Sequence, residues 1–299
     1  MSIIDGNTIA SARVMPRRTS PIRYFAKVFL SRPLVAIGLV IIIVNIVTAI
    51  FSPLLAPYDP YQINIKEALV QPSSEHLLGT DALGRDTLSR LIYGTRTSLT
   101  IAILAVGISV VFGMGLGLIA GYFGGLTSTI IMRFIDALMS CPGVILSLTI
   151  GTLLGGGITA IIIAVGISMM AMYARLMWAQ VLTIKQNDYI MAEYTQGAGN
   201  LRIMLKHILP NCVPVLIVTV TMQMGGAILM EAGLSFLGIG IKPPGAAWGF
   251  MINDGYSYIT SYPILSLAPG IAIILLVFAF NMVGDGLRDA LDPRLRGRI

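Results

Sequence analysis

The stretch that decides the fold covers residues 97–132 and is TSLTIAILAVGISVVFGMGLGLIAGYFGGLTSTIIM, which contains no charged side chain. A second uncharged stretch covers residues 137–174. A helix needs about 20 apolar residues to cross the hydrocarbon core of a bilayer, and both stretches exceed that length. Strands of a membrane barrel alternate apolar and polar residues in segments of roughly ten, which neither stretch does. The sequence therefore predicts an all-α integral membrane protein.

The composition of the whole chain indicates the same class. Of its 299 residues, 11% are charged and 56% are hydrophobic, and the mean hydropathy is +0.84. Soluble globular proteins carry about 25% charged residues, and disordered chains are poor in apolar residues, so both classes are excluded. The 20 Lys and Arg residues outnumber the 14 Asp and Glu residues. In a membrane protein we interpret this excess as a topology signal, and we expect no nucleic-acid partner.

Glycine, proline and polar clusters divide the apolar sequence into six predicted transmembrane helices. The glycine-rich segments 122–128 and 155–157 interrupt runs that would otherwise be too long for single helices. Each remaining run is close to the length that a bilayer requires. The predicted spans are residues 34–52, 99–121, 130–154, 158–177, 213–237 and 265–283.

The basic residues predict how the chain crosses the membrane. Six of them precede the first span, which is longer than a signal-peptide core of about 7 to 15 residues and is followed by no small-residue cleavage site. With the amino terminus inside, 15 Lys and Arg residues lie inside and 5 outside, as the positive-inside rule requires. We therefore expect a cytoplasmic tail (1–33), a first span (34–52), an extracytoplasmic segment (53–96), a five-helix core (97–284) with a cytoplasmic loop (182–210), and a cytoplasmic tail (285–299).

The chain shows no motif for catalysis. It contains no Gly-Lys dipeptide, so the loop that cradles ATP phosphates is absent. Neither HExxH nor GxSxG occurs, and Cys141 and Cys212 lie in apolar segments with no metal-ligand spacing. We expect no enzyme activity, no metal and no cofactor on this chain. Gly113, Gly117 and Gly121, spaced four residues apart, instead predict a helix face that a neighbouring helix approaches closely.

Ionisable residues are rare in the predicted spans. Arg133 and Asp136 lie one turn apart near the start of the third span, where they could form a structural ion pair or reach the membrane surface. Glu231, in the fifth span, has no charged neighbour in sequence. A carboxylate there would pair with another chain or line a hydrated path, and the sequence does not decide between these two roles.

The predicted cytoplasmic loop carries the most informative pattern. Residues 188–210 are DYIMAEYTQGAGNLRIMLKHILP. The segment begins with a helical pattern, is interrupted at Gly197 and Gly199, and continues with apolar residues at helical spacing before Pro210. This pattern predicts two short helices joined by a glycine bend. Such an element suits a groove on a soluble partner, although a pair of helices on the membrane surface would have the same pattern.

This loop resembles the signature of permease subunits from binding-protein-dependent ABC importers. That signature is EAA, three residues, Gly, nine residues, Ile, one residue and Leu-Pro. Gly197 and the pair Leu209-Pro210 match it, as does Ala192. The sequence departs from the general pattern at Met191, Glu193 and His207, which occupy the first and third EAA positions and the isoleucine position.

Three further stretches resemble the C-type permease of the dipeptide, oligopeptide and nickel importer group. They are HLLGTDALGRDTLSR (76–90), LSFLGIGIKPP (234–244) followed by Trp248-Gly249, and NMVGDGLRDALDP (281–293). In this group a histidine before Ile-Leu-Pro is ordinary. The resemblance covers almost the whole chain and implies the type I ABC importer permease fold in the inner membrane.

The resemblance also implies partners. We expect a homologous B-type permease, two cytoplasmic ATPase subunits that hold ATP and Mg²⁺ under the loop, and an extracytoplasmic binding protein that delivers the solute. The import path would lie between the two permeases, surrounded by membrane lipid. Peptides are the commonest cargo of the group, but nickel complexes, glutathione and opines remain open alternatives. A secondary transporter or a channel is the rival class.

Overall fold

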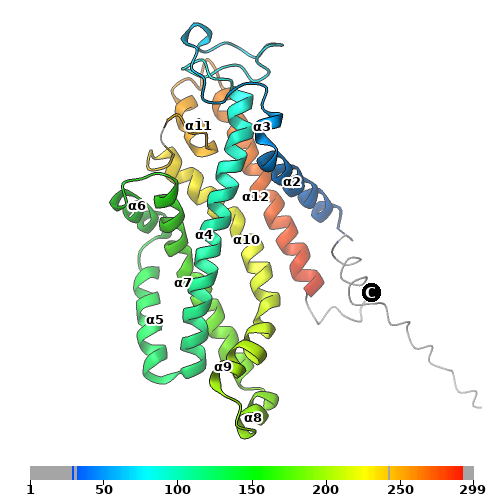
Figure 1. The fold of residues 1–299 in the computed structure, drawn as a ribbon, viewed down its shortest axis with the longest axis vertical. Coiled ribbons are helices and arrows are strands. Elements are labelled where there is room, and N and C mark those ends of the chain that lie inside the picture. The colour runs from blue at the N-terminus through cyan, green and yellow to red at the C-terminus, as the bar shows by residue number, and fades with distance from the viewer. Residues whose placement is uncertain (1–28, 30–31, 242, 292–299) are drawn as a thin grey trace, which may run out of the picture.

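The computed structural model describes residues 29, 32–241 and 243–291, and every regular element among them is helical (Figure 1). The predicted tails lie largely outside these residues, although residues 285–291 form the last turns of the final helix and not a tail. The helices are α2 (Pro33–Ile50), α3 (Ser52–Leu55), η1 (Ile65–Glu67), α4 (Thr87–Phe123), α5 (Gly125–Met139), α6 (Gly143–Leu153), α7 (Ile158–Lys185), α8 (Asp188–Thr195), α9 (Asn200–Arg202), the π-helical η2 (Ile203–Ile208), α10 (Leu209–Phe236), α11 (Trp248–Tyr256) and α12 (Ile264–Leu291).

Five continuous helical segments are long and apolar enough to span a membrane. They are α2, α4, α7, the α9–η2–α10 segment and α12, and a bent pair, α5 and α6, would make a sixth span. The prediction of an all-helical membrane protein with six spans is therefore confirmed in outline. In Figure 1 the long helices follow the long axis, with α8 at one end and the segment before α4 at the other; we call these the α8 end and the α11 end.

The third predicted span, residues 130–154, is not one straight helix. The structure breaks it between Met139 and Gly143, and α5 and α6 meet at 90°. Pro142 occupies the break in an extended conformation, and its ring nitrogen has no proton to donate to a preceding carbonyl. The apolar pattern predicted the right residues, but the proline changes the direction of the chain.

The second and fourth spans extend further than predicted. Asp86 begins α4 by accepting a hydrogen bond from the Ser89 amide at 2.7 Å, so the helix starts well before the apolar run. With 37 residues, α4 is about 55 Å long, whereas the hydrocarbon core of a bilayer is about 30 Å thick, so nearly half of the helix extends beyond the core. Helix α7 likewise continues to Lys185, into the predicted loop.

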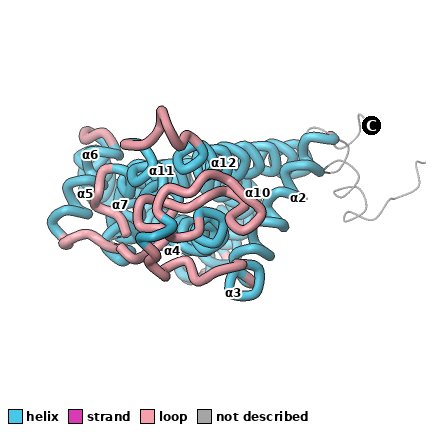
Figure 2. The backbone as a smooth tube through the Cα atoms, turned by 90° about the horizontal axis from the view of Figure 1, so that it is seen from above, coloured by secondary structure: helices cyan, strands magenta, loops and turns pink. Residues whose placement is uncertain are grey.

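The main apolar core lies where α4 packs against α7, α10 and α12. Fully buried residues include Ile101 of α4, Ile161 and Tyr173 of α7, and Leu276 of α12. Figure 2, which views the molecule from the α11 end, shows α5, α6 and α7 on one side and α2 on the other. The two sides of the bundle can therefore face different surroundings.

Candidate functional site

Helix α8 is held against the bundle by one buried side chain. Ile190 has no exposed surface and packs in a cluster with Met177 and Val181 of α7 and with Ile203 and Ile208 of η2. Helix α4 supports the same region, because the Tyr122 hydroxyl donates to Asn200 Oδ1 at 2.9 Å and Lys185 Nζ donates to the Tyr122 carbonyl at 2.6 Å. The segment that carries the sequence motif is therefore connected to two long helices.

The bend after α8 depends on Gly197. Its φ angle is +78°, and its amide donates to the Tyr194 carbonyl at 3.0 Å while the Ala198 amide donates to the Glu193 carbonyl at 3.0 Å. This pair of bonds ends a helix with one left-handed residue, a position that glycine adopts without a steric penalty. Gly199 has an ordinary extended conformation with φ −68°. Only at Gly197 does the backbone conformation require glycine.

The second half of the motif is not a separate short helix. After the bend, the chain is helical from Asn200 through the π-helical turn η2 and directly into α10. Pro210 is the second residue of α10 and directly follows the π-helical turn, where the regular α-helical hydrogen-bond pattern is already altered. The prediction of two short helices is therefore wrong for the second half, because the motif leads without interruption into a membrane span.

His207 and Glu193 join the two halves of the motif. His207 Nε2 lies 3.5 Å from Glu193 Oε1, and both side chains are less than one quarter exposed. The His207 carbonyl accepts from Asn211 Nδ2 at 2.6 Å. Two of the three departures from the general signature thus face each other across the bend, and their contact joins α8 to η2.

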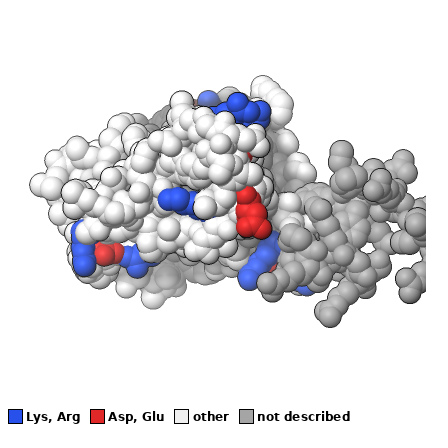
Figure 3. Space-filling view, turned by 90° about the horizontal axis from the view of Figure 1, so that it is seen from below, with Lys and Arg blue, Asp and Glu red and all other residues white. Residues whose placement is uncertain are grey.

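The outer surface of this segment is apolar and exposed. Met191 is 61% exposed, Leu201 66% and Leu205 50%, and Ala192 is also exposed. Figure 3, seen from the α8 end, shows charged groups separated by wide uncharged areas. The surface is therefore available to a partner; its role in coupling remains a prediction.

Gly113, Gly117 and Gly121 all face α7. A Cβ at Gly113 would lie 2.5 Å from the Met170 carbonyl oxygen, and one at Gly121 would lie 2.7 Å from Val181 Cβ. A Cβ at Gly117 would also collide with the Ala174 carbonyl. The two helices therefore pack with their backbones close together, which only glycine permits at these positions.

Asp136 pairs mainly with a residue that the sequence did not connect to it. Its Oδ1 contacts Arg175 Nη2 of α7, whereas Arg133 Nη1 lies 4.0 Å from its Oδ2. The predicted pair within α5 is thus the weaker part of a three-residue cluster. Arg175 is 39 residues from Asp136 in the sequence, so helical periodicity could not reveal this contact.

Glu231 is enclosed by this chain alone. It has no exposed surface, and its Oε1 accepts a hydrogen bond from the Ser235 hydroxyl at 2.8 Å, while Ser98 of α4 lies beside the same carboxyl. The side chain reaches neither a surface where another chain could pair with it nor an open path. Both roles predicted from the sequence are therefore corrected to a contact between α4 and α10.

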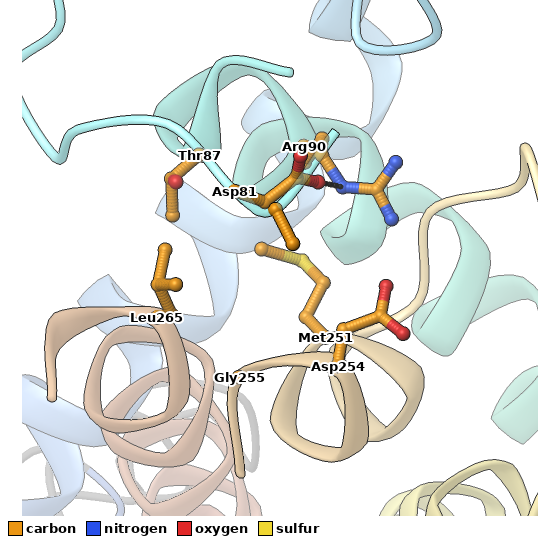
Figure 4. Close-up of a pocket in the computed structure, with 8 residues that line it drawn as sticks. Asp81, Thr87, Arg90, Met251, Asp254, Gly255 and Leu265 are labelled. Carbon is orange, nitrogen blue, oxygen red and sulfur yellow. Dashed lines mark ion pairs between the residues drawn. The ribbon is translucent and has the colours of Figure 1, made fainter. Parts of the chain in front are cut away.

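A second charged cluster joins the segments of the α11 end (Figure 4). Asp81 Oδ2 lies 2.6 Å from Arg85 Nε and 3.4 Å from Arg90 Nε, and Arg85 Nη2 lies 3.2 Å from Asp254 of α11. Arg90 is 1% exposed and also donates to the Pro60 and Pro244 carbonyls, each at 3.3 Å. The cluster therefore fixes the segment before α4 to α11.

A cavity of about 20 Å³ lies between these groups, large enough for one water molecule. Burial raises the pKa of Asp254 above its usual range, and the nearby Arg85 and Arg90 oppose this rise. Asp81, Arg85 and Arg90 lie in the stretch 76–90, whose sequence predicted no role for these residues. The alternating Asp and Arg residues of this stretch were the only sequence feature that could have indicated a charged cluster. Nothing in the sequence around Asp254 indicated that it joins the cluster.

The bundle of apolar helices with a connected, exposed α8 segment defines a multi-pass membrane protein of the permease class. A family model described as "Binding-protein-dependent transport system inner membrane component" matches residues 113–297, and one described as "N-terminal TM domain of oligopeptide transport permease C" matches residues 20–72. This chain belongs to the family of inner-membrane permease subunits of binding-protein-dependent transport systems, as the sequence motifs predicted.

Characterised relatives extend over almost the whole chain. The "Dipeptide transport system permease protein DppC" of Alkalihalophilus pseudofirmus is 41% identical over 93% of this chain and 91% of the relative. The "Nickel transport system permease protein NikC" of Escherichia coli K12 is 40% identical over 89% and 96%. A chain of the MetNI methionine ABC transporter in an inward facing conformation shares the fold, with a TM-score of 0.56 and 19% identity over 68% of this chain and 96% of that chain.

Proposed function

We propose that this chain is one of two homologous permeases in an ATP-driven importer of dipeptides and oligopeptides. The 41% identity to a dipeptide permease over nearly the full length supports the cargo class. The exposed α8 segment, continuous with α10, supports the coupling role, because a force applied to α8 would act directly on a membrane span. This continuity is the observation on which the proposal depends.

The family to which this chain belongs supports the proposal of further subunits. Two ATPase subunits would bind ATP and Mg²⁺, for which this chain has no phosphate-binding loop, and would seat the exposed surface of α8 in a groove on the cytoplasmic side. A B-type permease would complete the path, and an extracytoplasmic binding protein would deliver the solute to the α11 end. Both termini would then be cytoplasmic.

The test is purification of the complex by a tag on this chain, followed by reconstitution in liposomes. We expect a second permease and ATPase subunits to copurify, and radiolabelled dipeptide uptake to require both ATP and the binding protein. Uptake of nickel and of glutathione, measured in parallel, tests the alternative cargoes. Uptake that follows an ion gradient without ATP would contradict the importer and favour a secondary transporter.

A further inference from the structure

The side of the bundle formed by α5 and α7 exposes polar groups at membrane depth. Thr129, Arg133, Asp136 and Ser140 are spaced so that they share one face of α5. On α7, Met172 and Arg175 are exposed one turn apart, and Gln223 of α10 donates to Met172 Sδ at 2.8 Å. We call this set of groups the polar face.

The opposite side of the bundle is apolar. Exposed residues of α2 include Val40 and Val44, which are 59% and 56% exposed, and those of α12 include Ile271 and Ile274, at 53% and 66%. Polar and charged side chains are costly against lipid tails, so in a membrane they face water or another protein. We infer from the charged groups on α5 and α7 that the polar face, and not the side formed by α2 and α12, lies where the two permeases enclose the path.

The polar face contains a pocket of about 380 Å³ between α5 and α7. Gly117 of α4 packs beside the neighbouring Ala174, about two turns from the end of α4 at Phe123, which places the pocket in the half of the bundle nearer α8. The pocket, which we call the α5–α7 pocket, is lined by Ser128, Thr129, Met132, Arg133, Asp136, Arg175 and Trp178.

The charge of the α5–α7 pocket favours an anion. Two guanidinium groups face a single carboxylate. Arg133 is 81% exposed and lies 4.0 Å from this carboxylate, which already contacts Arg175. Trp178 Nε1 is satisfied by Ser128 Oγ at 3.0 Å, so its indole forms a wall without competing for the ligand. The excess of one positive charge matches one carboxylate, and a planar guanidinium binds a carboxylate through two parallel bonds.

We propose that the α5–α7 pocket is a binding site on the import path for a carboxylate of the transported solute, the terminal carboxylate where the solute is a peptide. This inference rests on the proposed function. A phospholipid phosphate is the competing occupant, but a headgroup site would not need the further polar side chains of Ser140 and Gln223 outside the pocket. A path for peptides would need such further polar side chains.

The first test compares two solutes in the complete importer reconstituted in liposomes. Arg175→Gln should lower the uptake of a dipeptide with a free carboxylate about tenfold, because it removes a charged hydrogen bond, and should leave uptake of the C-terminal amide nearly unchanged. Arg175→Lys should retain most of the preference for the free acid. Arg32→Gln is the matched control, since Arg32 pairs with Asp289 at 2.7 Å outside the polar face.

The second test measures whether the polar face is wet. In a chain without Cys141 and Cys212, a hydrophilic thiol reagent should label Met172→Cys and should not label Val44→Cys on α2. Equal labelling of the two positions would overturn the assignment of the path, and so would a failure to label both. This readout depends on water access and not on transport.

The outcomes of these tests distinguish a failure of the carboxylate site from a failure of the proposed peptide-import function. If the wild-type importer shows no ATP-dependent peptide uptake, the proposed function fails, and this inference fails with it. If the wild type transports peptides but Arg175→Gln lowers the uptake of free and amidated peptides equally, only the carboxylate site is overturned. Loss of bound anionic phospholipid from Arg175→Gln, with an unchanged preference between the two peptides, would assign the pocket to lipid.

Discussion

Gly197 and Gly199 lie in the same bend but differ in what the backbone demands. A Cβ at either position would meet no atom within 4 Å, so any effect of Gly→Ala comes from the backbone angles alone. At φ +78° a side chain costs about 1–2 kcal/mol, whereas φ −68° has no such cost. We expect Gly197→Ala to weaken ATPase copurification and peptide uptake several-fold and Gly199→Ala to leave both unchanged. Equal effects would show that the angle of the bend is unimportant.

Glu231 offers a second contrast at the scale of one side chain. Glu231→Gln keeps an acceptor for the Ser235 hydroxyl, and we expect nearly wild-type thermal stability in detergent. Glu231→Leu leaves the buried Ser235 hydroxyl without its carboxyl acceptor, at a cost of about 1–3 kcal/mol. Thermal unfolding of the purified chain measures both. A leucine variant as stable as the wild type would remove the structural role assigned to this contact.

At the scale of elements, the apolar runs predicted which residues form the spans, because a bilayer imposes a length that a sequence must meet. They did not predict where helices bend or how far they project. The break at Pro142 and the early start of α4 at its Asp86 cap depend on single residues beside the runs. The pairing of Arg85 with Asp254 spans 169 residues, and no local pattern connects positions so far apart.

The close packing of α4 on α7 gives a prediction with an internal control. A methyl group at Gly117 collides with the Ala174 carbonyl, whereas one at Gly115 meets no atom within 4 Å. We expect Gly117→Ala to lower the thermal stability by about 1–3 kcal/mol, as other overpacked positions do, and Gly115→Ala to be neutral or slightly stabilising. Unfolding of the two variants in the same detergent compares them directly. A tolerated Gly117→Ala would mean that the helices separate easily.

Under the proposed function, helix α8 is the element that would couple the ATPase subunits to the membrane spans. Ala192 is exposed on it, so Ala192→Asp should not disturb this chain but should force a charge into the groove of the ATPase. We expect normal membrane insertion with loss of uptake, through loss of the ATPase subunits or through ATP hydrolysis without transport. Gln186→Asp, exposed just before α8, is the matched control. Wild-type uptake by Ala192→Asp would favour helices that merely lie on the membrane.

At the scale of the whole molecule, the two ends have different compositions. At the α11 end a buried cluster of Asp81, Arg85 and Arg90 holds the loops above α4, while the α8 end exposes the apolar side chains of Met191, Leu201 and Leu205. These ends suit a site for solute delivery and a site for mechanical input, respectively. That assignment requires that the membrane separate them, with the α8 end in the cytoplasm.

Labelling of single cysteines tests this orientation. Ser73 and Ser257 are exposed in the α11 end and Gln186 is exposed near α8, so all three can carry a reactive thiol without disturbing the core. The basic residues concentrate on the α8 side of the predicted topology, and such residues resist transfer across the membrane. In intact cells, with Cys141 and Cys212 removed, an impermeant maleimide should label Ser73→Cys and Ser257→Cys and should reach Gln186→Cys only after lysis. Labelling of Gln186→Cys in intact cells, with the other two protected, would invert the chain and place α8 where no ATP is available, which would end the importer assignment.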